Sequence, residues 1–160
     1  MPTNCRQLNS KMLQLFQKQI QTSGESMIEK TYILMGDPVA LARTRVNFHS
    51  HRIWDSQKEL KLVCSIDLKN QHGSTPLFSG PLLLDVTFVM EIPKSRSKKK
   101  QCDMIDQYYY SRPDLSNLIK FAEDIANKIC YNDDMLIAKI IAQKIYGPEP
   151  YTKFTLKELK

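Results

Sequence analysis

The stretch from Arg112 to Tyr146 constrains the fold of this chain most, because it combines an apolar helical face with acidic residues at both ends. Apolar side chains recur at helical spacing over residues 115–129, which predicts an amphipathic helix with one buried face. Asp114 lies at the start of this helix, and the pair Asp133-Asp134 follows its end. Converging carboxylates repel one another unless a cation lies between them, so the pattern indicates divalent-metal and phosphate chemistry.

Each acid in this stretch also has a structural explanation. Asp114 suits the N-cap of the helix, and Asp133-Asp134 suits a turn, since Asp is common at both places. Lys120 and Asp124 are four residues apart, which is the spacing of a surface ion pair on a helix. Residue type alone leaves both explanations open.

The composition bounds the class of protein. The chain of 160 residues predicts one globular domain, and no apolar run is long enough for a transmembrane helix. The four cysteines are far apart and no secretory signal is visible, so we expect reduced thiols and a cytoplasmic, nucleoid-associated protein. A net charge of +6 and a pI near 9.1 favour a polyanionic partner such as nucleic acid.

The first 28 residues are predicted to form a separate helical extension, followed by a domain over residues 29–160. Leu8, Met12, Leu15, Phe16 and Ile20 fall on one helical face, and a polar segment then breaks the pattern. This helix either docks on the domain or contacts a partner.

The rest of the chain reads as an α+β domain in the order β-α-β-α-β-β. Strands are predicted over residues 31–36, 82–92 and 151–156, and a helix over residues 57–70. The spacing of apolar residues over 135–146 suits either a helix or a strand. The element order given above assumes a strand there. We therefore expect two helices packed on a small, mostly antiparallel or mixed sheet. The stripe expected to be buried on the first helix is Leu60, Val63, Cys64 and Leu68.

Two basic segments are candidates for contact with DNA phosphates. The first follows the first strand and interleaves cations with aromatic rings; the second follows the strand at 82–92, where such a run is usually a solvated loop. Tyr108, Tyr109 and Tyr110 come next, and they suit either rings that stack at a DNA branch or an edge strand that buries alternate rings. The candidate DNA-binding residues are Arg43, Arg45, Arg52, Lys94, Arg96, Lys98, Lys99, Lys100 and Arg112.

The ordered motifs resemble those of the RusA family of Holliday-junction resolvases. The match consists of RPDLSNLIK at residues 112–120, Asp124, Asp133-Asp134 and KIYG at residues 144–147, together with the strand at 82–92 and its basic run. The resemblance covers roughly residues 31–156. It implies a homodimeric, Mg²⁺-dependent endonuclease, with Mn²⁺ as a possible substitute, that cuts four-way DNA junctions by two symmetric incisions in recombination and repair. Such proteins are often encoded by phages or prophages.

The resemblance also implies roles for individual residues. Asp114, Lys120 and Asp134 would be catalytic. Asp114, Asp133 and Asp134 would hold the metal ion, with Ser116 or Asp124 as further candidate ligands. Asn117 matches a supporting position.

Ser116 departs from the family pattern. The family usually has a second Asp there, and a neutral hydroxyl binds Mg²⁺ much more weakly than a carboxylate does. The alternative function is therefore a protein on the same fold that binds branched DNA and cuts it weakly or not at all.

Overall fold

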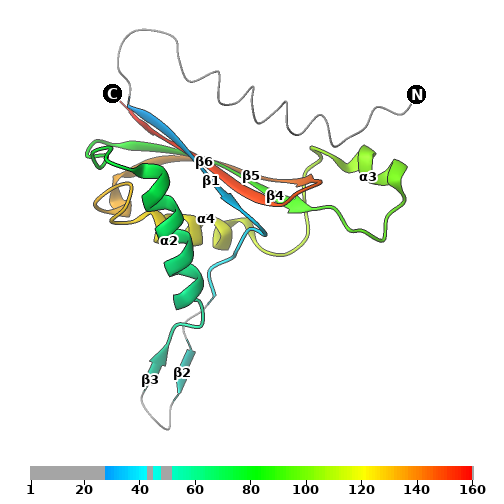
Figure 1. Ribbon diagram of the computed structural model, residues 1–160, viewed down its shortest axis with the longest axis horizontal. Helices are drawn as coiled ribbons and strands as arrows, with labels where there is room; N and C mark the ends of the chain where they lie inside the picture. The colour runs from blue at the N-terminus through cyan, green and yellow to red at the C-terminus, as the bar shows by residue number, and fades with distance from the viewer. Residues whose placement is uncertain (1–27, 43–44, 48–51, 160) are drawn as a thin grey trace.

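The computed structural model describes residues 28–42, 45–47 and 52–159, and it shows helices packed under one face of a sheet (Figure 1). The four strands of the sheet lie in the order β1-β6-β4-β5. β1 (Glu29–Met35), β6 (Tyr151–Glu158) and β4 (Leu82–Glu91) are antiparallel neighbours, and β5 (Ile137–Gly147) runs parallel to β4. The mixed sheet and the α+β class confirm the sequence prediction, and residues 135–146 resolve mainly as a strand.

The core lies between the sheet and two helices, α2 (Lys58–His72) and α4 (Leu115–Ala126). Alternate residues of β4 face the helices and are buried, as the alternation of apolar residues predicts. The amphipathic α4 buries its apolar face against them. The largest fully buried core side chains include Tyr32, Phe78, Phe88, Tyr131 and Phe154.

The buried stripe predicted for α2 is wrong in its N-terminal half. Leu68 is fully buried and Cys64 is half-buried, whereas Leu60 and Val63 are exposed. The reason is visible in Figure 1, where this half of the helix extends past the sheet toward the short strands β2 (Arg45–Asn47) and β3 (Arg52–Trp54).

The basic run after β4 contains a short helix, α3 (Lys98–Met104), where the sequence analysis predicts only a loop. Ser97 caps it, since the Ser97 side chain accepts a hydrogen bond from the Lys100 backbone N–H at 3.5 Å. The described residues therefore contain three helices instead of two. None of them is long and apolar enough to cross a membrane. The helix predicted over residues 1–28 lies almost entirely outside the described residues and stays a prediction.

The outer edge of β1 is occupied by a side-chain amide. The backbone N–H of Ile33 donates to Oε1 of Gln71 at 2.9 Å, and Nε2 of Gln71 donates to the Ile33 carbonyl at 2.7 Å. Gln71 comes from α2, so the amide reproduces one rung of a neighbouring strand and ties the helix to the sheet edge.

His72, at the end of α2, is buried against β1. Its Nδ1 lies 2.6 Å from the Tyr32 hydroxyl, and its carbonyl accepts a hydrogen bond from the Lys30 ammonium at 2.7 Å. Burial, followed by the positive charge of Lys30, lowers the pKa of His72 below its ordinary value of 6.5.

Acidification should destabilise the fold through His72. Below pH 6.5 the His72 side chain binds a proton in the unfolded chain but not in the folded chain. The contribution of neutral His72 to the free energy of unfolding is therefore complete above pH 6.5. It declines below that pH by at most about 1.4 kcal/mol per pH unit. Urea unfolding between pH 8 and pH 5 measures the slope. His72→Gln should show a smaller slope, and an equal slope in the two proteins would contradict the assignment.

Gly147, at the end of β5, should not tolerate a larger side chain. An added Cβ would overlap Cγ1 of Val89 on the neighbouring strand. We expect Gly147→Ala to lower the free energy of unfolding by about 1–3 kcal/mol. Gly80→Ala is the matched control, because its Cβ would meet nothing nearer than 3.7 Å. Similar urea midpoints for the two variants would contradict the prediction.

Candidate active site

Asp114 begins α4 but does not cap it with its side chain. Its backbone is extended, with φ −69° and ψ 137°, and its carboxylate makes no capping hydrogen bond. The Asp114 carbonyl instead accepts the first helical bonds, from the N–H groups of Asn117 and Leu118. The carboxylate is exposed, so capping by the side chain does not explain an acid at this position.

Asp133, in contrast, has the structural role that its residue type suggests. Its carboxylate accepts a hydrogen bond from the Met135 N–H at 3.0 Å and caps the 3₁₀ turn η1 (Asp134–Leu136). That bond, followed by one to the side chain of Asp134, lowers the pKa of Asp133 below its ordinary range. Asp134 follows directly and is exposed.

A polar hollow of about 180 Å³ lies beside the C-terminal half of α4. It brings together three of the predicted site residues, Lys120, Asp124 and Asp134. The lining residues are Leu41, Lys120, Glu123, Asp124, Asn127 and Asp134.

Asp114, Ser116 and Asp133 do not line this hollow. Lys120 lies six residues beyond Asp114, which is about 9 Å along the helix axis. No three His, Cys, Asp or Glu side chains among the described residues are close enough together to hold a metal ion jointly. Joint ligation by Asp114, Asp133 and Asp134 therefore stays a prediction.

Glu123 is a site residue that sequence reasoning missed. Burial raises its pKa, the negative charge of Asp134 raises it further, and the positive charge of Lys120 lowers it. Two carboxylates and an ammonium group thus interact in one hollow. The three-residue spacing from Lys120 to Glu123 was the available signal, but the proximity to Asp134 depends on the fold.

Asp124 pairs with a lysine that is distant in sequence. Lys61 of α2 contacts Asp124 at 2.8 Å and Asp55 at 2.8 Å. Burial alone would lower the pKa of Lys61, but the hydrogen bonds and charges of the two carboxylates outweigh burial and raise it. The local Lys120–Asp124 ion pair considered from spacing is not found; α2 supplies the partner.

The chain from β1 toward the β2–β3 hairpin passes the same hollow. The Leu41 N–H donates to the Asn117 carbonyl at 2.8 Å, which holds this chain on α4. The Gln57 side chain accepts from the Ala42 N–H at 2.7 Å and donates to the Ala40 carbonyl at 2.9 Å. The two ends of the hairpin segment are therefore fixed next to the hollow.

The predicted DNA contacts of this hairpin cannot be placed on the structure. Arg43 lies outside the described residues, as do the side chains of Arg45 and Arg52.

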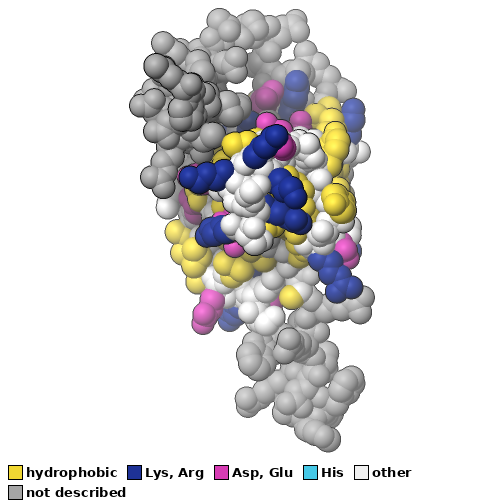
Figure 2. Space-filling view, turned by 90° about the vertical axis from the view of Figure 1, so that its right-hand side faces the viewer, with side chains coloured by type: hydrophobic (Ala, Val, Ile, Leu, Met, Phe, Trp, Pro, Cys, Tyr) yellow, Lys and Arg dark blue, Asp and Glu magenta, His cyan; other side chains and the backbone are white. Residues whose placement is uncertain are grey.

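The second basic segment lies at the far end of the sheet, around α3. Figure 2 looks at this end and shows several Lys and Arg side chains gathered on it. Within this basic run, Lys94 forms an exposed ion pair with Glu91 at 3.1 Å. Arg112 is exposed. The five cations of the basic run are exposed as well: Lys94, Arg96, Lys98, Lys99 and Lys100.

The tyrosine triplet packs one ring inward and leaves the other two residues exposed. Tyr109 turns inward, with its ring 4.8 Å from that of Tyr146 in an edge-to-face arrangement, and its N–H bonds to the edge of β5 at Lys144. The residues Tyr108 and Tyr110 are 74% and 89% exposed. Two rings thus remain available for stacking.

Lys144 supports the segment that leads to Asp114. Its ammonium donates to the carbonyls of Ser111 at 2.8 Å and Pro113 at 2.7 Å, and it lies 5.2 Å from the centre of the Tyr109 ring. A residue that the sequence marks only as part of a motif therefore positions the start of α4.

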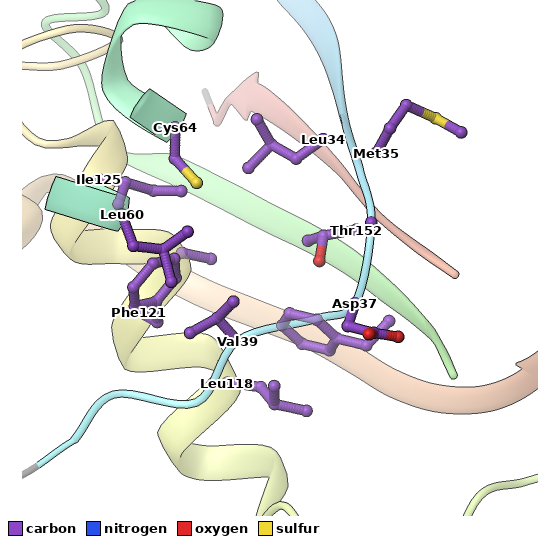
Figure 3. Close-up of a pocket in the computed structure, with 13 residues that line it drawn as sticks. Leu34, Met35, Asp37, Val39, Leu60, Cys64, Leu118, Phe121, Ile125 and Thr152 are labelled. Carbon is purple, nitrogen blue, oxygen red and sulfur yellow. The ribbon is translucent and has the colours of Figure 1, made fainter. Parts of the chain in front are cut away.

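The other large cavity is a less suitable catalytic site. It has a volume of about 190 Å³ and lies between α2, α4 and the end of β1, where mostly hydrocarbon side chains face one another (Figure 3). Asp37 is the single acid among its lining residues. Acid–base and phosphate chemistry therefore favours the polar hollow.

A comparison with protein families decides the relationship. The family described as "Endodeoxyribonuclease RusA" matches residues 35–157, which is most of the chain. This chain belongs to the RusA family. The match includes the hollow, Lys144 and the basic run after β4. Family membership supports nuclease activity, branched DNA as the substrate and dependence on a divalent metal ion.

A curated relative aligns with most of this chain, but its name states no activity. The chain is 24% identical over 136 residues to "Uncharacterized protein YqaN" of Bacillus subtilis (strain 168). The alignment covers 80% of this chain and 95% of that protein.

Replacing Lys144 should destabilise the RusA-family domain next to Asp114. In Lys144→Met the carbonyls of Ser111 and Pro113 lose their charged donor, which should cost about 1–3 kcal/mol of unfolding free energy. Lys139→Met, on the same strand, is the control, because Lys139 is exposed and makes no described polar contact. Urea unfolding should separate the two variants, and equal midpoints would contradict the role of Lys144.

Proposed function

We propose that this protein is a Mg²⁺-dependent, structure-specific endodeoxyribonuclease that resolves four-way DNA junctions by paired symmetric incisions. The observation that carries the proposal is the polar hollow, where Lys120, Glu123 and Asp134 come together in a member of an endodeoxyribonuclease family. An ammonium group beside carboxylates suits a phosphate group and its metal ion.

The donor atoms available at this end of the domain fit Mg²⁺. Carboxylate and amide oxygens are the protein ligands that Mg²⁺ prefers, and one or two carboxylates with waters and substrate oxygens suffice. The side-chain Oδ1 of Asn127 is buried without a hydrogen-bond partner among the described residues, and Asn127 lines the hollow. We propose Asp114, Asp133 and Asp134 as ligands, with Ser116 or Asp124 as further candidates.

When bound, the metal ion would activate a water molecule and neutralise charge that develops on the phosphate. The residues of the chain then have separate tasks. Lys120 would donate hydrogen bonds to a phosphate oxygen as negative charge grows there. Asp124 pairs with Lys61, and Lys120 forms no ion pair with it, so the Lys120 ammonium would be available. Lys144 fixes the backbone before Asp114.

DNA binding would use the basic segments without reading sequence. Contacts from Lys94, Arg96 and Arg112, among other cations of the two segments, would add salt-dependent affinity for phosphates. A four-way junction has two-fold symmetry, so a homodimer would present two identical hollows to its two matching strands.

A protein that binds branched DNA without cutting it is the second candidate. Ser116 in place of the usual Asp, and the absence of a three-ligand cluster among the described residues, favour this alternative. The two functions share the fold and differ in whether phosphodiester bonds are broken.

Asp114→Asn and Asp134→Asn should each reduce nicking at least about 100-fold, because each removes a charge needed to hold the metal ion. The assay is a synthetic four-way junction with each strand labelled in turn, incubated with Mg²⁺, in which the wild type should produce paired symmetric nicks. Asp103→Asn is the control, since Asp103 lies on the exposed side of α3, outside the hollow.

Ser116→Asp should raise the nicking rate, because it restores the carboxylate usual in the family. Tight, salt-sensitive junction binding without nicks in both the wild type and Ser116→Asp would contradict the nuclease proposal and assign the binding function. Equal affinity for branched and linear DNA would contradict both functions.

A further inference from the structure

The outward face of α2 carries an apolar stripe that is largely open to solvent. Leu62, Val63 and Ile66 are 61%, 63% and 53% exposed. The opposite side of the helix, at Leu68 and His72, packs into the core. Three adjacent aliphatic side chains on one exposed helical face are a typical contact surface.

Opposite charges flank this stripe. Glu59 lies one turn before it and Lys69 one turn after it; both are exposed, and neither has an ion-pair partner among the described residues. Glu59, Leu62, Ile66 and Lys69 recur at alternating steps of three and four residues. This is the spacing of the contact positions in a coiled-coil pair.

We propose that this face of α2 is the surface through which two copies of the chain pair, with the two helices antiparallel about a two-fold axis. The axis passes midway between Leu62 and Ile66. Leu62 then packs on Ile66 of the partner subunit, and Glu59 faces Lys69 of the partner subunit. Because the contact is isologous, each of these pairs occurs twice. The inference rests on the proposed homodimer and specifies its surface.

Charge favours a second copy over the N-terminal segment as the occupant. The apolar face predicted within residues 1–28 could cover the stripe, but residues 4–21, which include this face, have basic side chains and no acid to face Lys69. A second copy of α2 supplies both an acid and a base at the required spacing. A partner of another kind would have to reproduce the same pattern.

Pairing through α2 also has a consequence for the site. Lys61, on an adjacent side of α2, contacts Asp124 beside the hollow. In such a dimer, α2 of each subunit would connect the interface to the hollow of the same subunit. The distance between the two hollows would then be set by the pairing of the two helices.

Sedimentation of the full-length protein tests the surface. The wild type should be a dimer, and Ile66→Glu should weaken dimerisation at least about 100-fold because it places charge in both apolar layers. Ile141→Glu is the matched control: Ile141 lies on the open face of β5 and is 47% exposed, close to the value for Ile66. Circular dichroism should show that both variants remain folded.

A charge exchange tests the antiparallel arrangement. Glu59→Lys and Lys69→Glu should each weaken the dimer about tenfold, since like charges then meet at both ends of the helix pair. The double variant restores opposite charges and should return to within about threefold of the wild-type dissociation constant.

The outcomes separate the possible failures. A wild type that stays monomeric at high concentration, with and without junction DNA, would overturn the homodimer itself. If Ile141→Glu dissociates the dimer, Ile66→Glu does not, and the charge exchange restores nothing, the protein is a dimer but α2 is not its interface. A third outcome would assign the face to the N-terminal segment. In that case the dimer would be insensitive to Ile66→Glu, and deletion of residues 1–27 would make the backbone amides of the stripe exchange hydrogen faster.

Discussion

The parallel pairing of β4 with β5 is the constraint on which the rest of the domain depends. Parallel neighbours cannot be joined by a tight turn, so the chain must cross the sheet between them. That crossover contains α3, the tyrosine triplet, α4 and η1. Every acid of the candidate site therefore lies in a connection that the sheet requires, and α4 is fixed because its apolar face completes the core.

The sequence predicts most of this framework because the relevant patterns are local. Alternation over β4 and helical spacing over α4 each identify a buried face without knowledge of the partner. The prediction fails for Val63 in α2, since spacing cannot show that the N-terminal half of the helix extends past the sheet. The short α3 was missed because a run of lysines looks like a solvated loop.

The candidate site was predictable only where its residues belong to a local sequence pattern. Lys120 and Asp124 follow from the helix, and Asp134 follows from the acidic pair after it. Glu123 and Lys61 could not be predicted from spacing, because their roles depend on contacts across the fold. These contacts alter the charge of the hollow: Lys61 compensates Asp124, so the uncompensated carboxylates among the lining residues are those of Glu123 and Asp134.

The amide of Gln71 on β1 makes the two edges of the sheet unequal. An open strand edge is a template on which another extended chain can add as a further strand, in ordered assembly or in aggregation. At β1 an incoming chain would have to displace both hydrogen bonds of Gln71 at Ile33. On β5, residues 106–109 bond to the C-terminal part of the outer edge. Growth of the sheet by strand addition is therefore hindered at both edges, which disfavours aggregation through the sheet.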